Sequence, residues 1–206
     1  MHPVLLTIAS INAGVCMKAT SHSYSLATYL PIPKFKGVPS EEQSLLSNHI
    51  YHICLDIITH SLKEAKDVGK DLSDPAGNVC QCHTPLVSWI ADLPEQHVPV
   101  GVTSSQSPTS TTTLNKFGDG ICHLHHICNF TPSNIAMACS TADPKDLPPF
   151  IKASSLLSLN GVHQPFWCNW EEADPLQFLT TDALHQWHKF YSDHPLKWMI
   201  NIMRRA

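Results

Sequence analysis

The densest run of metal-binding residue types lies between residues 122 and 128. It contains Cys122, His123, His125, His126 and Cys128. Thiolates and neutral imidazoles are the donors that zinc prefers, usually four of them at the corners of a tetrahedron. The C-x5-C spacing matches none of the common structural-zinc patterns, and no second pair of ligands is spaced to complement it. We therefore favour adventitious metal binding here, and a zinc-dependent binding module is the alternative.

A second group of polar residues follows a helical spacing. His49, His52, Asp56 and His60 lie at positions i, i+3, i+7 and i+11, so on a helix they would form one stripe beside the apolar face. This stripe could ligate zinc, and the alternative is a solvated polar face. The sequence contains no G-x-S-x-G, Gly-rich phosphate loop, H-E-x-x-H or C-x-x-C motif.

Carboxylates are few, and Asp92 has the most informative position. It follows a strand-like run, and Glu95 comes three residues later. An acid at the end of a strand can hold a divalent metal ion over the edge of a sheet. The alternative is that Asp92 is a polar cap on the turn after the strand.

The elements that would position these residues can be predicted along the chain. Apolar runs at 4–11 and 24–32 predict two strands, the first of them buried, separated by a polar turn region. Ser40 and Gln43 have the form of a capping box, which predicts the start of a helix that ends near Gly69. Its expected buried face is formed by Leu46, Ile50, Ile53, Ile57, Ala65 and Val68.

The next segment combines turn residues with strand character. A turn is expected at 73–78, followed by a strand from Val79 to Ile90 that stops before Pro94. Cys80 and Cys82 alternate on this strand and would point their thiols to one face, which usually means packing.

The second half of the chain reads as loops and helices. Eight of the ten residues at 104–113 are Ser or Thr, which predicts a mobile loop. Short helices and loops are expected over 120–170. Thr181 would cap a helix that buries Leu184, Trp187 and Tyr191 and that breaks at Pro195, before a final helix over 196–203.

Composition excludes several classes of protein. The chain has 206 residues, a net charge of −4 and only 15% charged residues, together with 14 histidines and 16 prolines. These values exclude a coiled coil, a collagen, a long membrane span and a histone-like polycation. The eight cysteines would suit a secreted disulfide framework, but the apolar start has no basic residue before it. We therefore expect no signal peptide, no transmembrane helix, no membrane partner, and reduced cysteines inside the cell.

Several long blocks of the sequence resemble a known family. The resemblance covers roughly Pro3 to Trp198 and includes the string PLVSWIADLPEQ, and its segments are 29–35, 73–78, 84–96, 159–170 and 184–198. In this order they resemble Plavaka-type transposases, which are transposon-encoded proteins of basidiomycete fungi related to the CACTA and KDZ groups. The resemblance implies a nuclear protein that acts on DNA.

The fold implied by the resemblance is α/β (α+β), an incomplete ribonuclease-H-like core with a mostly helical insertion. Residues 1–100 would supply the partial core, with two strands, a long helix and a strand that ends at Asp92. Residues 101–120 would be the Ser/Thr-rich mobile loop, and residues 121–206 the mainly helical insertion.

The chemistry implied by the resemblance is DNA strand cleavage and transfer by two Mg²⁺ ions held by three acids. Asp92 matches the second acid, and we expect the first and the last to lie outside this sequence. Relatives often carry a C-P-x-C zinc element, but here the matching place reads Ser-Pro-Thr-Ser at 107–110. His185 and His188 would be the remaining ligands of that element.

Three hypotheses follow. The first is a transposon-derived fragment of a DDE-type transposase that is not catalytically competent alone. The second is a divalent-metal-dependent strand-transfer enzyme completed by missing segments or a partner chain. The third is the zinc-dependent module at 122–128. DNA binding by this piece alone should be weak, because a chain with net charge −4 gains little from counterion release. Transposase subunits as partners are not indicated by the sequence.

Overall fold

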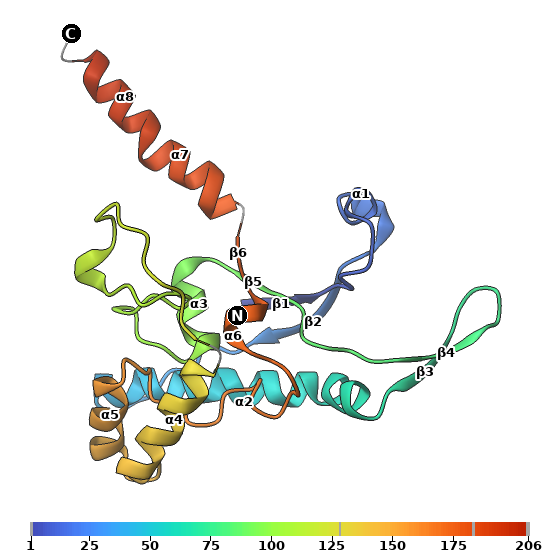
Figure 1. The fold of residues 1–206 in the computed structure, drawn as a ribbon, viewed down its shortest axis with the longest axis horizontal. Coiled ribbons are helices and arrows are strands. Elements are labelled where there is room, and N and C mark those ends of the chain that lie inside the picture. Colours follow the sequence, from blue (N-terminus) through green and yellow to red (C-terminus); the bar gives the residue numbers. More distant parts are fainter. Residues whose placement is uncertain (1, 128, 183, 205–206) are drawn as a thin grey trace.

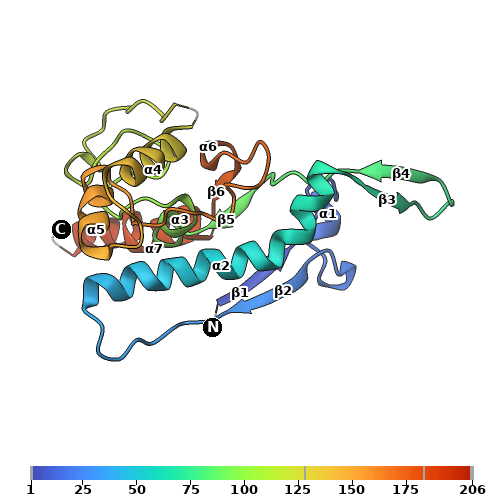
Figure 2. The same cartoon turned by 90° about the horizontal axis from the view of Figure 1, so that it is seen from below.

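Helix α2 (Ser40–Asp67) is the longest element, and the other elements are arranged along it (Figure 1). An antiparallel ladder of β1 (His2–Leu6) and β2 (Ser25–Leu30) lies on one side of α2, while α4 (Phe130–Thr141) and α5 (Leu147–Leu156) lie on the other side (Figure 2). This computed structural model describes residues 2–127, 129–182 and 184–204.

The two expected N-terminal strands are present, but the first is shorter and less buried than predicted. It ends at Leu6, and Thr7 Oγ1 then donates to the carbonyl oxygen of Ser23 at 2.7 Å. The connection contains helix α1 (Ala13–Cys16) and the turn η1 (Ala19–Ser21). Leu5, Leu6 and Ile8 are exposed, so the prediction of a buried strand was wrong. The other described elements therefore cover only part of the two-stranded β1–β2 sheet.

Helix α2 begins and ends where expected, but the predicted capping box is absent. Pro39 is the N-cap, and the Gln43 side chain donates to the carbonyl oxygen of Val38 at 2.6 Å. At the other end Gly69 has φ +80°, and a Cβ there would meet the Gln81 side chain at 2.7 Å. A residue with a side chain would therefore be strained at this helix stop.

The buried face of α2 differs from the predicted one. Ile53 and Ile57 are 56% and 70% exposed, whereas His52 is 1% exposed. Neighbouring segments contact α2 along a stripe that includes Leu55 and His52 and extends to Lys63. The Lys63 ammonium group donates to the Asp56 carboxylate and to the carbonyl oxygen of Phe166. The covered face of α2 is thus the one whose His52 and Lys63 bond to the backbone of Val98 and Phe166.

A hairpin of β3 (Lys70–Ser73) and β4 (Val79–Cys82) follows α2 and projects beyond its end (Figure 1). The predicted turn is confirmed, because the Asp74 carboxylate accepts from the backbone N–H of Ala76 and of Asn78, each at 2.8 Å. The predicted strand to Ile90 is divided, since β5 (Trp89–Ala91) forms a separate strand. Cys80 is exposed, so the prediction that it packs was wrong.

The Ser/Thr-rich segment has more local structure than expected. Ser107 Oγ accepts from the N–H of Ser110 at 3.1 Å, and the N–H of Thr111 donates to the carbonyl oxygen of Leu124 at 2.9 Å. Gln106 and Thr112 are buried. The turn η2 (Leu114–Lys116) follows. The composition suggested an unstructured segment, but these bonds give it local structure. Its mobility stays a prediction.

One hydrophobic cluster draws on residues from both sides of that segment. It joins β2 and α2 to α4, α5, the 159–170 segment and helix α6 (Pro175–Phe178). The expected helices and loops over 120–170 are therefore confirmed, and they share this core with the N-terminal half. Its buried members are Leu30, Leu55, Ile135, Ala138, Phe150, Leu159, Phe166, Trp167, Trp170 and Phe178.

The chain ends in helical segments that project from the body, which we call the C-terminal rod (184–203; Figure 1). A π-helical turn, η3 (Leu184–Lys189), leads into α7 (Phe190–Asp193) and α8 (Pro195–Met203). The predicted break at Pro195 is confirmed. The predicted burial of Leu184, Trp187 and Tyr191 was wrong, because all three are exposed.

The fold class is α+β, as expected. In the part of the chain that the structure describes, the strands form three separate two-stranded sheets, and a ribonuclease-H-like sheet is not formed by them. The third sheet pairs β5 with β6 (Leu179–Thr181) in parallel. None of the described helices has the length and apolar character that crossing a membrane needs.

Candidate functional site

The parallel pair β5–β6 brings two carboxylates to one edge. Ala91 is the register partner of Thr181, so Asp92 and Asp182 are the next residues on the two strands. The N–H of Asp182 donates to the carbonyl oxygen of Ala91 at 3.1 Å, which holds the two strand ends together. Because the carboxyl ends of parallel strands meet at one edge, side chains far apart in sequence become neighbours.

Asp92 directly precedes helix α3 (Leu93–Val100) and is its N-cap. Its Oδ1 accepts from the N–H of Glu95 at 3.0 Å. The alternative that Asp92 caps the turn after the strand is therefore confirmed. The cap uses one oxygen, and the other, Oδ2, lies 3.8 Å from a ring nitrogen of His185, so a role in capping and a role in a site are compatible.

Asp182 and His185 complete the arrangement. Asp182 Oδ1 accepts from the N–H of Leu184 at 2.7 Å, and His185 Nδ1 donates to Asp182 Oδ2 at 2.5 Å. The other ring nitrogen, His185 Nε2, lies 3.8 Å from Asp92 Oδ2. The hydrogen bond from His185 is the main cause that lowers the pKa of Asp182, and the bond from Leu184 adds to it. Asp182 is thus held as a carboxylate.

These three side chains border a cavity of about 290 Å³ between the strand ends and the base of the C-terminal rod. Carboxylate oxygens suit divalent cations such as Mg²⁺, and cationic groups beside them suit an anionic ligand. Among the described residues no group of three or more His, Cys, Asp or Glu side chains is arranged to hold a metal ion. The side chains at this edge are Asp92, Asp182, His185, Lys189, Phe190, Asp193 and His194.

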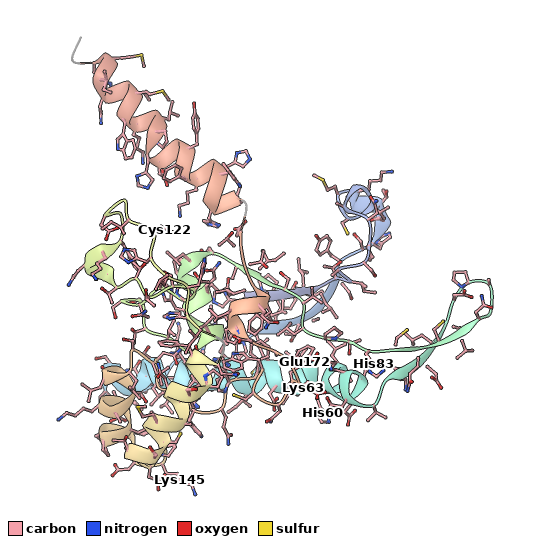
Figure 3. All side chains as sticks on the ribbon, viewed as in Figure 1. His60, Lys63, His83, Cys122, Lys145 and Glu172 are labelled. Carbon is pink, nitrogen blue, oxygen red and sulfur yellow. The ribbon has the colours of Figure 1, made fainter. Side chains whose placement is uncertain are left out.

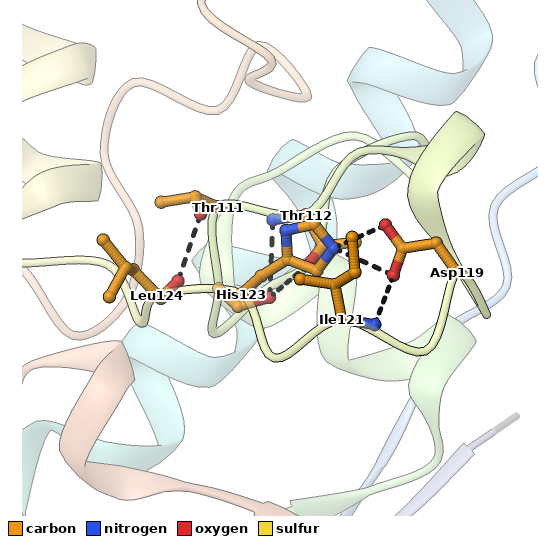
Figure 4. Close-up of polar contacts among 7 residues, drawn as sticks. Thr111, Thr112, Asp119, Ile121, His123 and Leu124 are labelled. Carbon is orange, nitrogen blue, oxygen red and sulfur yellow. Dashed lines mark hydrogen bonds and ion pairs between the residues drawn. The ribbon is translucent and has the colours of Figure 1, made fainter.

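The histidines at 123–126 bond to separate partners, and Cys122 is exposed. His123 Nε2 donates to Asp119 Oδ2 at 2.9 Å, and the same carboxylate accepts from the N–H of Ile121 (Figure 4). These two bonds, the backbone bond first, lower the pKa of Asp119. Cys122 is exposed on the same loop (Figure 3).

The other residues of this candidate zinc site are also engaged. His125 Nδ1 donates to the carbonyl oxygen of Thr109 at 3.3 Å. His126 Nε2 donates to the carbonyl oxygen of Ser107 at 3.1 Å, and its ring stacks on Phe130 with centroids 3.9 Å apart. Cys128 lies outside the described residues. The described members do not converge on one point, and zinc binding stays a prediction.

The histidines of α2 and of the rod are likewise dispersed. His52 is buried in the core, while His60 is exposed and pairs with Glu64 at 3.2 Å (Figure 3). His188 is exposed on the π-helical turn, and only its neighbour His185 reaches the carboxylate pair. The structure therefore brings His185 together with Asp92, and separates it from the other predicted ligands.

Asp182 is the site residue that the sequence did not indicate. The sequence placed it in the first turn of the helix that Thr181 was expected to cap, whereas it follows strand β6 directly. The available signal was the same as at Asp92, a short β-prone run followed directly by an acid. Nothing local shows that this run pairs with β5 rather than joining the helix.

The chain was compared with known protein families, curated proteins and solved structures. A family model described as Plavaka transposase matches residues 1–199 of the chain. Searches of curated proteins and of solved structures returned no match.

Proposed function

Because this chain belongs to the Plavaka transposase family, we propose that it serves DNA strand cleavage and transfer, with the Asp92–Asp182 edge as the place where a divalent cation is held. The observation that carries this proposal is the pairing of β5 with β6, which aligns the two acids. We further propose a nuclear location, since the substrate of a DNA transposase is chromosomal.

The two carboxylates at this edge are part of the donor set that the Mg²⁺ implied by the family would need, and among the described residues no third His, Cys, Asp or Glu side chain joins them in a metal-binding arrangement. Asp92 and Asp182 supply carboxylate oxygens, which are the ligands that Mg²⁺ and Mn²⁺ prefer. When bound, such an ion activates the attacking water or hydroxyl group and stabilises negative charge at the phosphate. The protein's own contribution is positional. The cap on α3 orients Asp92, and the bonds from Leu184 and His185 orient Asp182.

We also propose that this chain alone does not cleave DNA. Two-metal strand cleavage in the family uses three acids. Asp92 and Asp182 supply two carboxylates at this edge. Asp193 borders the same cavity but pairs with Lys197 at 3.0 Å, and among the described residues no group of three His, Cys, Asp or Glu side chains is arranged to hold a metal ion. In this proposal a further carboxylate comes from another segment or from a partner chain, and the chain is a transposon-derived fragment of a DDE-type transposase.

We propose further that the chain carries an incomplete ribonuclease-H-like core, which would need strands beyond the three two-stranded sheets of the described residues. Val4 of β1 and Trp89 of β5 pack against the same core, and each of these strands pairs with one described neighbour, β2 or β6. Each therefore has an open edge that can accept a further strand. A strand between β1 and β5 would join the two ladders into one mixed sheet.

Metal binding by the purified chain tests the proposal. We expect Mn²⁺, measured by calorimetry, to bind about tenfold or more weakly to Asp92→Asn and to Asp182→Asn, because each change removes one anionic ligand. Asn is also a good N-cap, so the fold should survive both changes. Asp71→Asn, an exposed acid on the β3–β4 hairpin, is the matched control. Equal Mn²⁺ affinity in all four proteins would contradict the site.

A plasmid-nicking assay tests the absence of activity. With Mn²⁺ present, the wild-type chain should nick supercoiled DNA no faster than Asp92→Asn. Nicking by the wild type that disappears in Asp92→Asn would contradict the fragment proposal and support a complete enzyme.

A further inference from the structure

Three exposed rings form a ladder along the C-terminal rod. The ring centroids of Phe190 and His194 are 5.5 Å apart, and those of His194 and Trp198 are 5.8 Å apart. The side chains of this rod stand out on its surface, away from the body of the molecule (Figure 3). Neighbouring rings are tilted by 42° and 53° to each other and contact one another, so flat partners can stack only on their outer, exposed faces.

The distribution of tryptophan points to the same surface. Trp167 and Trp170 are buried in the core and Trp89 packs against it. Trp187 and Trp198 are 76% and 58% exposed, and both lie on the rod. Large exposed aromatic surface of this kind usually marks a place of interaction.

The charge of the rod is opposite to that of the whole chain. Between residues 184 and 203 there are two cationic side chains, Lys189 and Lys197, and one carboxylate, Asp193, which pairs with Lys197 at 3.0 Å, whereas the chain as a whole has a net charge of −4. Lys189 and Lys197 each directly precede a ring of the ladder. Cations beside exposed rings suit a polyanion whose flat groups are free to stack, and this describes single-stranded nucleic acid.

The ladder is continuous with the carboxylate edge. Lys189, Phe190 and His194 border the same cavity as Asp92 and Asp182. We propose that the rod is a track for a single strand of DNA, which stacks its bases on Phe190, His194 and Trp198 and so delivers a backbone phosphate to the carboxylate edge. This inference rests on the proposed function, which identifies the nucleic acid as DNA. A second copy of the chain, packed on the apolar residues of the rod, is the competing occupant.

Fluorescence anisotropy of a labelled oligothymidine with the full-length chain tests the track. The titration is done in EDTA at low salt, so that it does not depend on a metal site. We expect Trp198→Ala and Phe190→Ala each to weaken binding by about tenfold, because each removes a stacking surface. Tyr24→Ala, an exposed aromatic on the β1–β2 connection, is the matched control and should bind like the wild type.

Two further measurements complete the test. Lys189→Gln should lower the slope of log affinity against log salt by about 0.7, the value for one contact with a single-strand phosphate. Circular dichroism should be the same for all variants, since these side chains are exposed. Unchanged affinity in Trp198→Ala, or equal affinity for a duplex of the same length, would overturn the proposal.

Sedimentation velocity addresses the competing occupant. A dimer that dissociates in Trp198→Ala, without any change in oligothymidine affinity, would show that the rod binds a second copy and would overturn the track. Because the DNA titration contains no metal, it can succeed when Mn²⁺ fails to bind. Failure of this inference is therefore distinguishable from failure of the proposed function.

Discussion

Replacing Trp167 with Ala is expected to lower the free energy of unfolding by about 3–5 kcal/mol. Trp167 is 1% exposed, and its ring packs near Phe178 in the hydrophobic core. Its Nε1 also donates to the carbonyl oxygen of Pro99 at 2.6 Å. The substitution therefore leaves a cavity and removes the donor of a buried carbonyl group.

Trp187, the exposed tryptophan of the rod that is not part of the ring ladder, supplies a matched control. Trp187→Ala removes the same side chain at a site that is 76% exposed, so stability should change by no more than about 0.5 kcal/mol. Urea denaturation followed by circular dichroism measures both variants. Trp167→Phe keeps an apolar ring and removes the hydrogen-bond donor, so it should lower the free energy of unfolding less than Trp167→Ala does. A similar loss in Trp167→Ala and Trp187→Ala would contradict the core described above.

Acidification from pH 6.5 to pH 4 is expected to destabilise the protein through His52 by about 3 kcal/mol. Burial is the main cause that lowers the pKa of His52, to about 4. His52 Nε2 donates to the carbonyl oxygen of Val98 at 2.9 Å, and Nδ1 accepts from the N–H of Phe166 at 3.1 Å. The ring is thus fixed in its neutral form, because protonation of Nδ1 would remove that acceptor.

The direction of this pH dependence follows from the pKa of His52 in the unfolded and in the folded protein. The unfolded chain binds the proton near pH 6.5, and the folded chain binds it only near pH 4. The stabilisation by neutral His52 is therefore complete above pH 6.5 and decreases as the pH falls toward 4. Denaturation midpoints measured across this range should show the decrease.

Variants separate His52 from the other histidines. In His52→Asn this part of the pH dependence should disappear, although stability at pH 7 will be lower because the bonds to Val98 and Phe166 are altered. His60→Gln, at an exposed position of the same helix, should keep the wild-type slope. His49 is half-buried, and desolvation is the main cause that lowers its pKa, so it will contribute to the slope in all three proteins. An equal slope in wild type and His52→Asn would contradict the assignment.

The local elements could be predicted because their signals are local. Helix α2 ends at Asp67, close to Gly69 as expected, since the chain adopts a positive φ at position 69 and glycine does so without strain. The turn at 74–78 follows from Asp74, whose side chain bonds to nearby backbone groups. The end of β5 at Asp92 follows from an acid and Pro94, which together suit the start of a helix.

Burial was the least predictable property. The spacing of apolar residues indicated that Ile53 and Ile57 face the core, but the segments around Val98 and Phe166 cover the side of α2 that carries His52. On the rod, amphipathic spacing indicated a buried face, and the described residues leave Trp187 and Tyr191 exposed. A pattern shows that a helix has an apolar face, while the partner that covers it is a property of the whole fold.

The amino-acid sequence by itself therefore determined the order and type of most elements, the family, and the position of Asp92 at the end of a strand. Only the tertiary structure paired β5 with β6 and so brought Asp182 and His185 to Asp92. The physical reason is the range of the interactions. Caps, turns and helix stops depend on residues a few positions apart, whereas a parallel strand pair joins segments that are distant in sequence and leaves no local pattern.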